Sequence, residues 1–411
     1  MTITPTGTFT AVPTATPTCG GELVWGLGPE KAIASQSGGR VWLTKTVPTE
    51  TGWGVFWLRD DPGRSGYARV YYAHVDFAGN TDIAPRMVNE VPKIPWRDRY
   101  YNVAWNGEFY ALITAERDKV YFQKMTLEGE TSDRRIVGPG LFYNTPWDQE
   151  ADSDIDAYPG GFLVVIEGDC GGHSCSYAFR LNDDGIQQGS SQNLVDFDFT
   201  HQFWPKTAFD GVGFVVVSVK DAVSIGGATT KYIRVATWGS PSQYRKVISG
   251  KDYLWDEYPD IAYNGNHYGS IWTEVNKRPS AGSPDFWQIR FATFNRTYTT
   301  GSDISNRILD QQEFKSPYRW AKNVHAIGRD FVMHYSSWRE GTGPAAVFEW
   351  LDSSSQGHAR FSPFLLSADA LGSSVHFAPG HDTRVGVARG SADEQGTTVT
   401  FHTLDPPQCN D

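Results

Sequence analysis

The stretch WDEYPDIAYNGNHYGSIWTE, from Trp255 to Glu274, constrains the fold more than any other part of the chain. PDIAY alternates apolar and polar residues as a half-buried strand does, and HYGSIWTE alternates again. Between them, NGNH carries the Asn-Gly pair that favours a tight turn between antiparallel strands. The stretch therefore predicts one β-hairpin.

The same order of strand, turn and strand recurs along the whole chain. Each copy has an anchor residue in its first strand, and successive anchors lie roughly 50 to 60 positions apart, a spacing typical of propeller blades. The anchors are Val41, Val103, Ile155, Thr207, Ile261, Val324 and Val375. Each hairpin is followed by a third strand such as VYFQKMTL and a short fourth one such as RRIV. The chain shows no helical periodicity, so the pattern predicts an all-β fold, namely a seven-bladed β-propeller. The count would be six or eight blades if the first copy is misread.

The two ends of the chain are expected to meet in the last blade. The final copy supplies only three strands, SVHFAP, RVGVARG and TTVTFHTL, so we expect ELVWG (22–26) to complete it and close the ring. Cys19 precedes that strand and Cys409 follows the third one, which predicts a Cys19–Cys409 disulfide bond. Closing so long a loop would stabilise the fold by roughly 4 to 5 kcal/mol in the chain-entropy model.

A second cysteine pair lies within GDCGGHSC. We expect Cys170 and Cys175 to close a small disulfide loop; the alternative is a metal site with His173, which lacks a fourth ligand nearby. Cysteines that pair in this way favour an oxidising compartment. A secreted or cell-surface protein is therefore expected, although no leader precedes residue 1 in this sequence.

Composition indicates how the chain divides into domains and which partners are disfavoured. Residues 1–18 form a Thr/Pro-rich tract that we interpret as a tether, and residues 19–411 as a single propeller domain. The net charge is -11 and the basic residues form no run, which disfavours nucleic-acid binding. No stretch approaches the roughly 20 apolar residues of a membrane span. Walker, dinucleotide-binding, HExxH and GxSxG motifs are absent in any supporting context.

The candidate site follows from propeller geometry. Loops that lead into the innermost strands open onto one face around the central channel, and five of these loops place aromatic rings beside charged or imidazole groups. The candidate ligand-binding residues are Trp96, Arg97, Trp147, Asp148, Glu150, His201, Trp204, Trp255, Asp256, Glu257, Arg319 and Trp320. We expect a ligand to lie over this channel mouth.

Two interpretations of these residues stay open. The rings could pack between blades or serve as platforms for sugar rings, whose hydroxyl groups would bond to the charged side chains. The carboxylates could form salt bridges between blades or act as a catalytic pair. For their charge partners we favour Arg97 and Arg319 over a Ca²⁺ ion, and we expect no other cofactor. His325, His334 and His376 are expected near the innermost strands. They could be buried core residues, or one of them could act as a base or a metal ligand.

YPDIAYNGNHYGSIW and YNVAWNGEFYALI resemble the repeats of secreted bacterial β-propeller proteins, whose hairpin follows a PxVAWNGxxYLVVW pattern. The resemblance extends over residues 38 to 404 and is strongest in these two copies. It implies an extracellular or cell-surface propeller and assigns no chemistry.

Three functions from different classes fit this sequence. The leading hypothesis is a binding module for a carbohydrate or a similar surface ligand, because aromatic and charged groups recur together. A glycoside hydrolase or polysaccharide lyase that uses the channel-mouth carboxylates or a histidine is the alternative. A scaffold for protein partners is the third.

Overall fold

The computed structural model describes most of the blades and many of the turns between strands. The described residues are 23–36, 41–61, 63–64, 66–92, 101–116, 119–138, 153–169, 174–194, 202–223, 229–237, 246–247, 254–276, 286–296, 305–313, 321–339, 343–351, 364–367, 374–380, 384–393 and 396–409. Their regular structure is entirely β-strand. Within these ranges no helix is long and apolar enough to cross a membrane.

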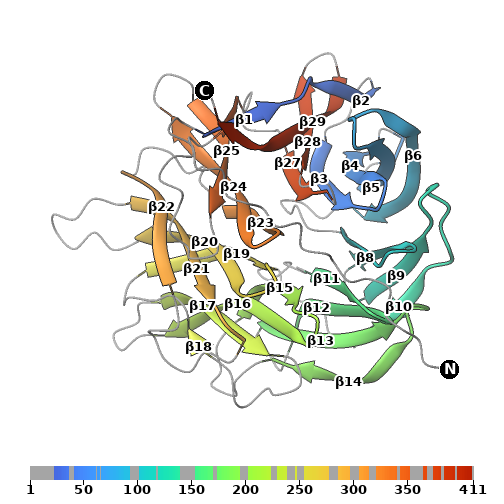
Figure 1. The fold of residues 1–411 in the computed structure, drawn as a ribbon. Coiled ribbons are helices and arrows are strands. Elements are labelled where there is room, and N and C mark those ends of the chain that lie inside the picture. The colour runs from blue at the N-terminus through green and yellow to red at the C-terminus, as the bar shows by residue number, and fades with distance from the viewer. Residues whose placement is uncertain are drawn as a thin grey trace.

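The strands form seven antiparallel blades arranged in a ring (Figure 1). Blade 1 contains β3 (Val41–Pro48), β4 (Gly52–Asp60), β5 (Tyr67–Asp76) and β6 (Thr81–Pro92). Blade 2 contains β7 (Tyr101–Trp105), β8 (Tyr110–Glu116), β9 (Lys119–Met125) and β10 (Arg135–Val137). Blade 3 contains β11 (Ser153–Tyr158), β12 (Gly161–Asp169), β13 (Ser174–Asn182) and β14 (Gln187–Asn193).

The second half of the ring repeats this arrangement. Blade 4 contains β15 (Gln202–Phe209), β16 (Phe214–Val223), β17 (Thr229–Thr237) and β18 (Lys246–Val247). Blade 5 contains β19 (Leu254–Tyr263), β20 (Tyr268–Asn276), β21 (Phe286–Phe294) and β22 (Ser305–Glu313). Blade 6 contains β23 (Ala321–Ile327), β24 (Asp330–Arg339), β25 (Gly343–Leu351) and β26 (Phe364–Ser367). Blade 7 contains β27 (Ser374–Pro379), β28 (Val385–Asp393) and β29 (Gly396–Cys409).

Two N-terminal strands complete blade 7. The predicted closing strand is confirmed as β1 (Leu23–Leu27), which pairs antiparallel with the end of β29 so that Leu23 lies opposite Cys409. A second strand that the sequence pattern did not predict, β2 (Lys31–Gln36), pairs with the beginning of β29. The long β29 therefore holds both N-terminal strands, and the ring closes without a separate fourth strand from the C-terminus.

The hydrophobic core lies between the blades rather than inside any one of them. Between blades 2 and 3, for example, the rings of Phe122 and Phe162 are 5.9 Å apart and both are buried. Sheets stacked in this way need large flat side chains to fill the space between them. This explains why aromatic residues reach 14% of the chain.

The cysteine predictions fall partly on residues outside the described ranges. Cys175 is fully buried and disulfide-bonded; Cys170 lies outside the described residues, so its pairing with Cys175 stays a prediction. Cys19 also lies outside them. The pairing of Leu23 with Cys409 brings the start of β1 to the end of β29, and four residues can span at most about 14 Å. The predicted Cys19–Cys409 bond is compatible with that reach.

Candidate functional site at the central channel

The predicted ligand-binding residues were expected at the mouth end of the channel, where the innermost strands begin. Of these, Trp204 alone has a described side chain. The backbone of Trp255, Asp256 and Glu257 lies in β19, where these residues pair with Val275, Glu274 and Thr273. The remaining eight lie outside the described residues: Trp96, Arg97, Trp147, Asp148, Glu150, His201, Arg319 and Trp320.

A one-residue bulge recurs at the mouth end of four innermost strands. It lies between Val41 and Leu43 in β3, Phe203 and Lys206 in β15, Glu257 and Asp260 in β19, and Ala321 and Asn323 in β23. In the last three strands the bulge ends at the residue directly before the anchor. In β3 it ends at Leu43, so the residue equivalent to the other anchors is Thr44 and not Val41. Bulges bend a strand, redirect side chains and are frequent beside functional sites.

Two of these bulges hold backbone strain. Trp204 and Tyr258 are the non-glycine residues with positive φ in the described ranges, at 51° and 55°, and each directly precedes a proline. A bulky residue in this region costs of the order of 1 to 3 kcal/mol and persists only where its surroundings hold it. The two residues occupy equivalent positions in neighbouring blades.

The strained residues stack on each other. The ring centroids of Trp204 and Tyr258 are 4.4 Å apart with an interplanar angle of 21°, and Trp204 is only 8% exposed. Trp204 therefore packs between blades 4 and 5, as one of the two interpretations expected. Its contribution to ligand binding stays a prediction.

Further along the innermost strands, polar side chains occupy the positions directly before or after the anchors. We call them the channel-wall residues: Lys45, Asn102, Asp154, Asp156, Lys206, Asp260, His325 and His376. Electrostatic interactions connect them across the ring, since Lys45 of blade 1 influences both Asp260 of blade 5 and His325 of blade 6. They therefore share one space around the axis.

Several channel-wall side chains accept a backbone N–H from the next blade. Asp154 accepts from Thr207 at 3.0 Å and Asp156 from Phe209 at 2.7 Å. Asp260 accepts from Val324 at 2.8 Å. These carboxylates fasten blade to blade through backbone amides.

Two carboxyl groups in this wall have pKa values near neutrality. Burial raises the pKa of Asp156 to about 7, the Phe209 amide opposes the shift, and neighbouring Asp154 adds to it. Burial raises the pKa of Asp260 to about 6, with Asp154 adding to the shift and Lys206 opposing it. Carboxyl groups of this kind can hold a proton near neutral pH and release it, as general acids do.

The pKa values of His325 in blade 6 and His376 in blade 7 are lowered, which favours the neutral imidazole. Burial and the charge of Lys45 lower the pKa of His325 to about 4. The same two causes, with contributions from His325, His334 and Lys206, lower the pKa of His376 well below its ordinary value. The rings of His325 and His376 lie 5.9 Å apart.

A metal centre finds no support in the part of the chain that the structure describes. No group of three or more His, Cys, Asp or Glu side chains there is placed to hold a metal ion. The carboxylates for which Ca²⁺ was considered all lie outside this part: Asp148 and Glu150 as whole residues, Asp256 and Glu257 in their side chains.

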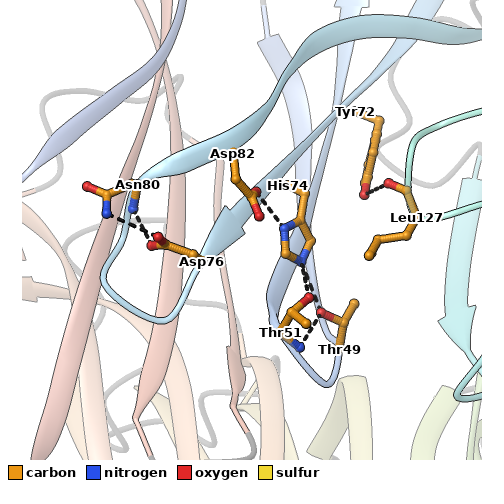
Figure 2. A network of polar contacts seen from close by, with 8 residues as sticks. All are labelled: Thr49, Thr51, Tyr72, His74, Asp76, Asn80, Asp82 and Leu127. Carbon is orange, nitrogen blue, oxygen red and sulfur yellow. Dashed lines mark hydrogen bonds and ion pairs between the residues drawn. The ribbon is translucent and has the colours of Figure 1, made fainter.

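Blade 1 contains a second polar network, far along the strands from the mouth (Figure 2). His74 Nδ1 lies 2.6 Å from Asp82 Oδ1, and His74 Nε2 lies 3.0 Å from Thr49 Oγ1 and 3.4 Å from Thr51 Oγ1. The order of hydroxyl, imidazole and carboxylate is that of a nucleophilic triad, in which the base must reach the substrate. Here the His74 base and Thr49 are fully buried, whereas Asp82 and Thr51 are exposed, so the imidazole cannot reach a substrate. The network therefore secures the β3–β4 turn and is not a catalytic site.

The channel-wall carboxylates and lysines were not predicted from the sequence. The signal was present, because these residues flank the anchors that define the repeat. Their side chains become a site only through the placement of the next blade, which a single strand pattern does not contain.

No family model and no curated protein matches the chain. Among solved structures, the β-propeller domain of Cps50 (Swd1) from Myceliophteria thermophila is 8% identical, with a TM-score of 0.48 over 91% of this chain and 99% of that one. A protein of unknown function from Dyadobacter fermentans is 10% identical, with a TM-score of 0.42 over 92% and 98%. A neuraminidase-like protein of A/little yellow-shouldered bat/Guatemala is 8% identical, with a TM-score of 0.42 over 93% and 100%. Similarity at this level says nothing about ligand or activity.

Proposed function

We propose that this β-propeller is a secreted or cell-surface protein that binds a carbohydrate, or a similar polyhydroxylated surface ligand, at the channel mouth. The observation that carries the proposal is the recurring bulge at the mouth end of β3, β15, β19 and β23. A defect repeated at one position of four blades, and strained in two of them, indicates a constraint beyond strand pairing.

The bulge in β19 directly follows three of the candidate ligand-binding residues. Trp255, Asp256 and Glu257 come immediately before it, and Lys231 of blade 4 forms a parallel bridge with Trp255. Their backbone is thus fixed by two blades at once. Alternate residues of a strand share a face, so Trp255 and Glu257 would offer a ring and a carboxylate together. This pair suits a sugar, which presents an apolar face and hydroxyl groups together.

The disulfide chemistry of the chain supports a location outside the cytoplasm. Cys175 is disulfide-bonded, and structural disulfides persist in oxidising compartments. The resemblance of the hairpins to secreted bacterial propeller repeats supports the same location.

A second candidate function, glycoside hydrolysis or polysaccharide cleavage, is favoured by one observation. Asp156 and Asp260 carry pKa values of about 7 and about 6 on the wall of one channel. Acid–base cleavage of a glycosidic bond uses two carboxyl groups, one protonated and one ionised.

A glycan array followed by incubation with each hit tests both candidates. Binding without release of new reducing ends supports the lectin-like function, and release that disappears in Asp156→Asn supports the enzyme. An array on which the folded protein binds no glycan, together with co-purification of a protein partner, would contradict both candidates in favour of a scaffold.

A further inference from the structure

We propose that the seam between blade 7 and blade 1 is a pH-sensitive latch, in which His376 accepts the Thr46 N–H only while its imidazole is neutral. The site lies where the innermost strand of the last blade, β27, meets that of the first, β3. The latch is independent of any ligand at the mouth.

The hydrogen bonding across this seam is specific. The backbone N–H of Thr46 donates to His376 Nδ1 at 3.0 Å, and Thr46 Oγ1 donates to the His376 carbonyl at 3.1 Å. Both residues are buried, at 2% and 8% exposure. A ring nitrogen accepts a hydrogen bond only when it carries no proton, so protonation at Nδ1 would set two donors against each other.

The equivalent contact at another seam responds differently to acid. Asp156 occupies the same repeat position in blade 3 and accepts the Phe209 N–H at 2.7 Å. A protonated carboxyl still has oxygen lone pairs that accept a hydrogen bond. The seam between blades 3 and 4 therefore keeps its contact when it gains a proton, whereas the seam between blades 7 and 1 loses it.

The surroundings of His376 determine when the latch releases. The charged and titratable groups that act on it are Lys45 on β3, His325 on β23, His334 on β24 and Lys206 on β15. On β28 the residue paired with His376 is Ala388, and on β4 the residue paired with Thr46 is Val55, so neither strand adds a charge there. The two lysines oppose protonation, and the latch stays closed at neutral pH.

Other contacts at this seam do not titrate. Trp53 Nε1 donates to the Ala378 carbonyl at 3.0 Å, and Thr44 Oγ1 donates to the Ala388 carbonyl at 3.5 Å. Acid is therefore expected to loosen the seam locally, not to unfold the propeller.

Hydrogen–deuterium exchange on the full chain tests the latch. Protection of the Thr46 amide is compared between pH 7 and pH 4 with protection of the Leu112 amide, in the buried middle strand β8 of blade 2, after correction for intrinsic exchange. In the unmodified protein the ratio should fall by about tenfold or more, the change that one pKa unit corresponds to. His376→Asn, whose side-chain oxygen can accept the same N–H without titrating, should keep the ratio constant.

His267→Asn, a histidine replaced in a turn of blade 5, is the matched control and should behave like the unmodified protein. If His376→Asn does not fold, His376→Asp reproduces the carboxylate contact of blade 3 and should also keep the ratio constant. A constant ratio in the unmodified protein, or a fall that persists in the His376 variant, would overturn the proposal.

Discussion

The channel wall of blades 3 to 5 and the channel wall of blades 6 and 7 do the same structural work with different chemistry. In the first, Asp154, Asp156 and Asp260 accept backbone N–H groups from the following blade. In the second, His376 does so. The repeated fold thus fixes where the contact forms, but not which side chain accepts it. Because a carboxyl group accepts in one part of the ring and an imidazole in the other, the two parts respond to pH in opposite directions.

The sign of each response follows from its pKa shift. For Asp156 and Asp260 the folded-state pKa lies above the ordinary value, so protonation stabilises the fold at low pH and this contribution is lost as pH rises through about 7 and about 6. For His325 the folded-state pKa lies below the ordinary value, so its contribution is present above about 6.5 and lost as pH falls through about 4.

Replacement of Asp156 by asparagine should break the comparison most strongly. The amide oxygen can still accept the Phe209 N–H, but no buried charge forms as pH rises. The free energy of unfolding at pH 8 should increase by about 2 to 4 kcal/mol, with little change at pH 4. Urea unfolding across this pH range measures the effect. Asp133→Asn, at an exposed site, is the control, and an equal effect in both variants would refute the assignment.

Replacement of His325 by asparagine should remove part of the acid sensitivity on the other side. The unmodified protein should lose roughly 2 to 3 kcal/mol of stability from this group between pH 6.5 and pH 4. The variant should lose correspondingly less, as measured by the same unfolding series. His267→Asn provides the comparison, and a variant as acid-sensitive as the unmodified protein would show that His325 does not carry the effect.

Replacement of Asp154 by asparagine should have a smaller effect, on the pKa values of the two neighbouring carboxyl groups. Asp154 raises the pKa of both Asp156 and Asp260, so its removal should lower both pKa values, by less than about one pH unit each. Carboxyl carbon NMR titration measures the two shifts directly. A rise in either pKa would contradict the shared electrostatic field of this wall.

The sequence pattern predicted the blades well because each hairpin is local. YPDIAYNGNHYGSIW contains both strands and the turn of one blade, and the anchor spacing then counts the blades. The pattern also predicted the closing strand, since ELVWG had no partner elsewhere. It missed β2, whose KAIASQ lacks a strong strand pattern, and it aligned the first blade on Val41 because the bulge at Trp42 shifts the register.

The site was less predictable for physical reasons. Asp154 and Asp260 look like the polar half of an ordinary alternating strand, and their role depends on an amide in the next blade. That contact is set by how the blades stack, which no single repeat encodes. The aromatic and charged candidate residues were predicted from their recurrence in the loops that lead into the innermost strands, and their use in binding stays a prediction.

The most direct test of the account is to compare the two ends of the channel in one binding assay. Trp255→Ala combined with Glu257→Ala alters the mouth end, and Trp105→Ala alters the turn end, where Trp105 Nε1 bonds to Glu50 at 2.9 Å. The affinity for a glycan identified on the array should fall by about a hundredfold or more only in the mouth variant, a loss of at least about 2.7 kcal/mol, with little change in Tm. Retained affinity in the mouth variant together with a large drop in Tm would contradict the account, because these residues would then be packing between blades.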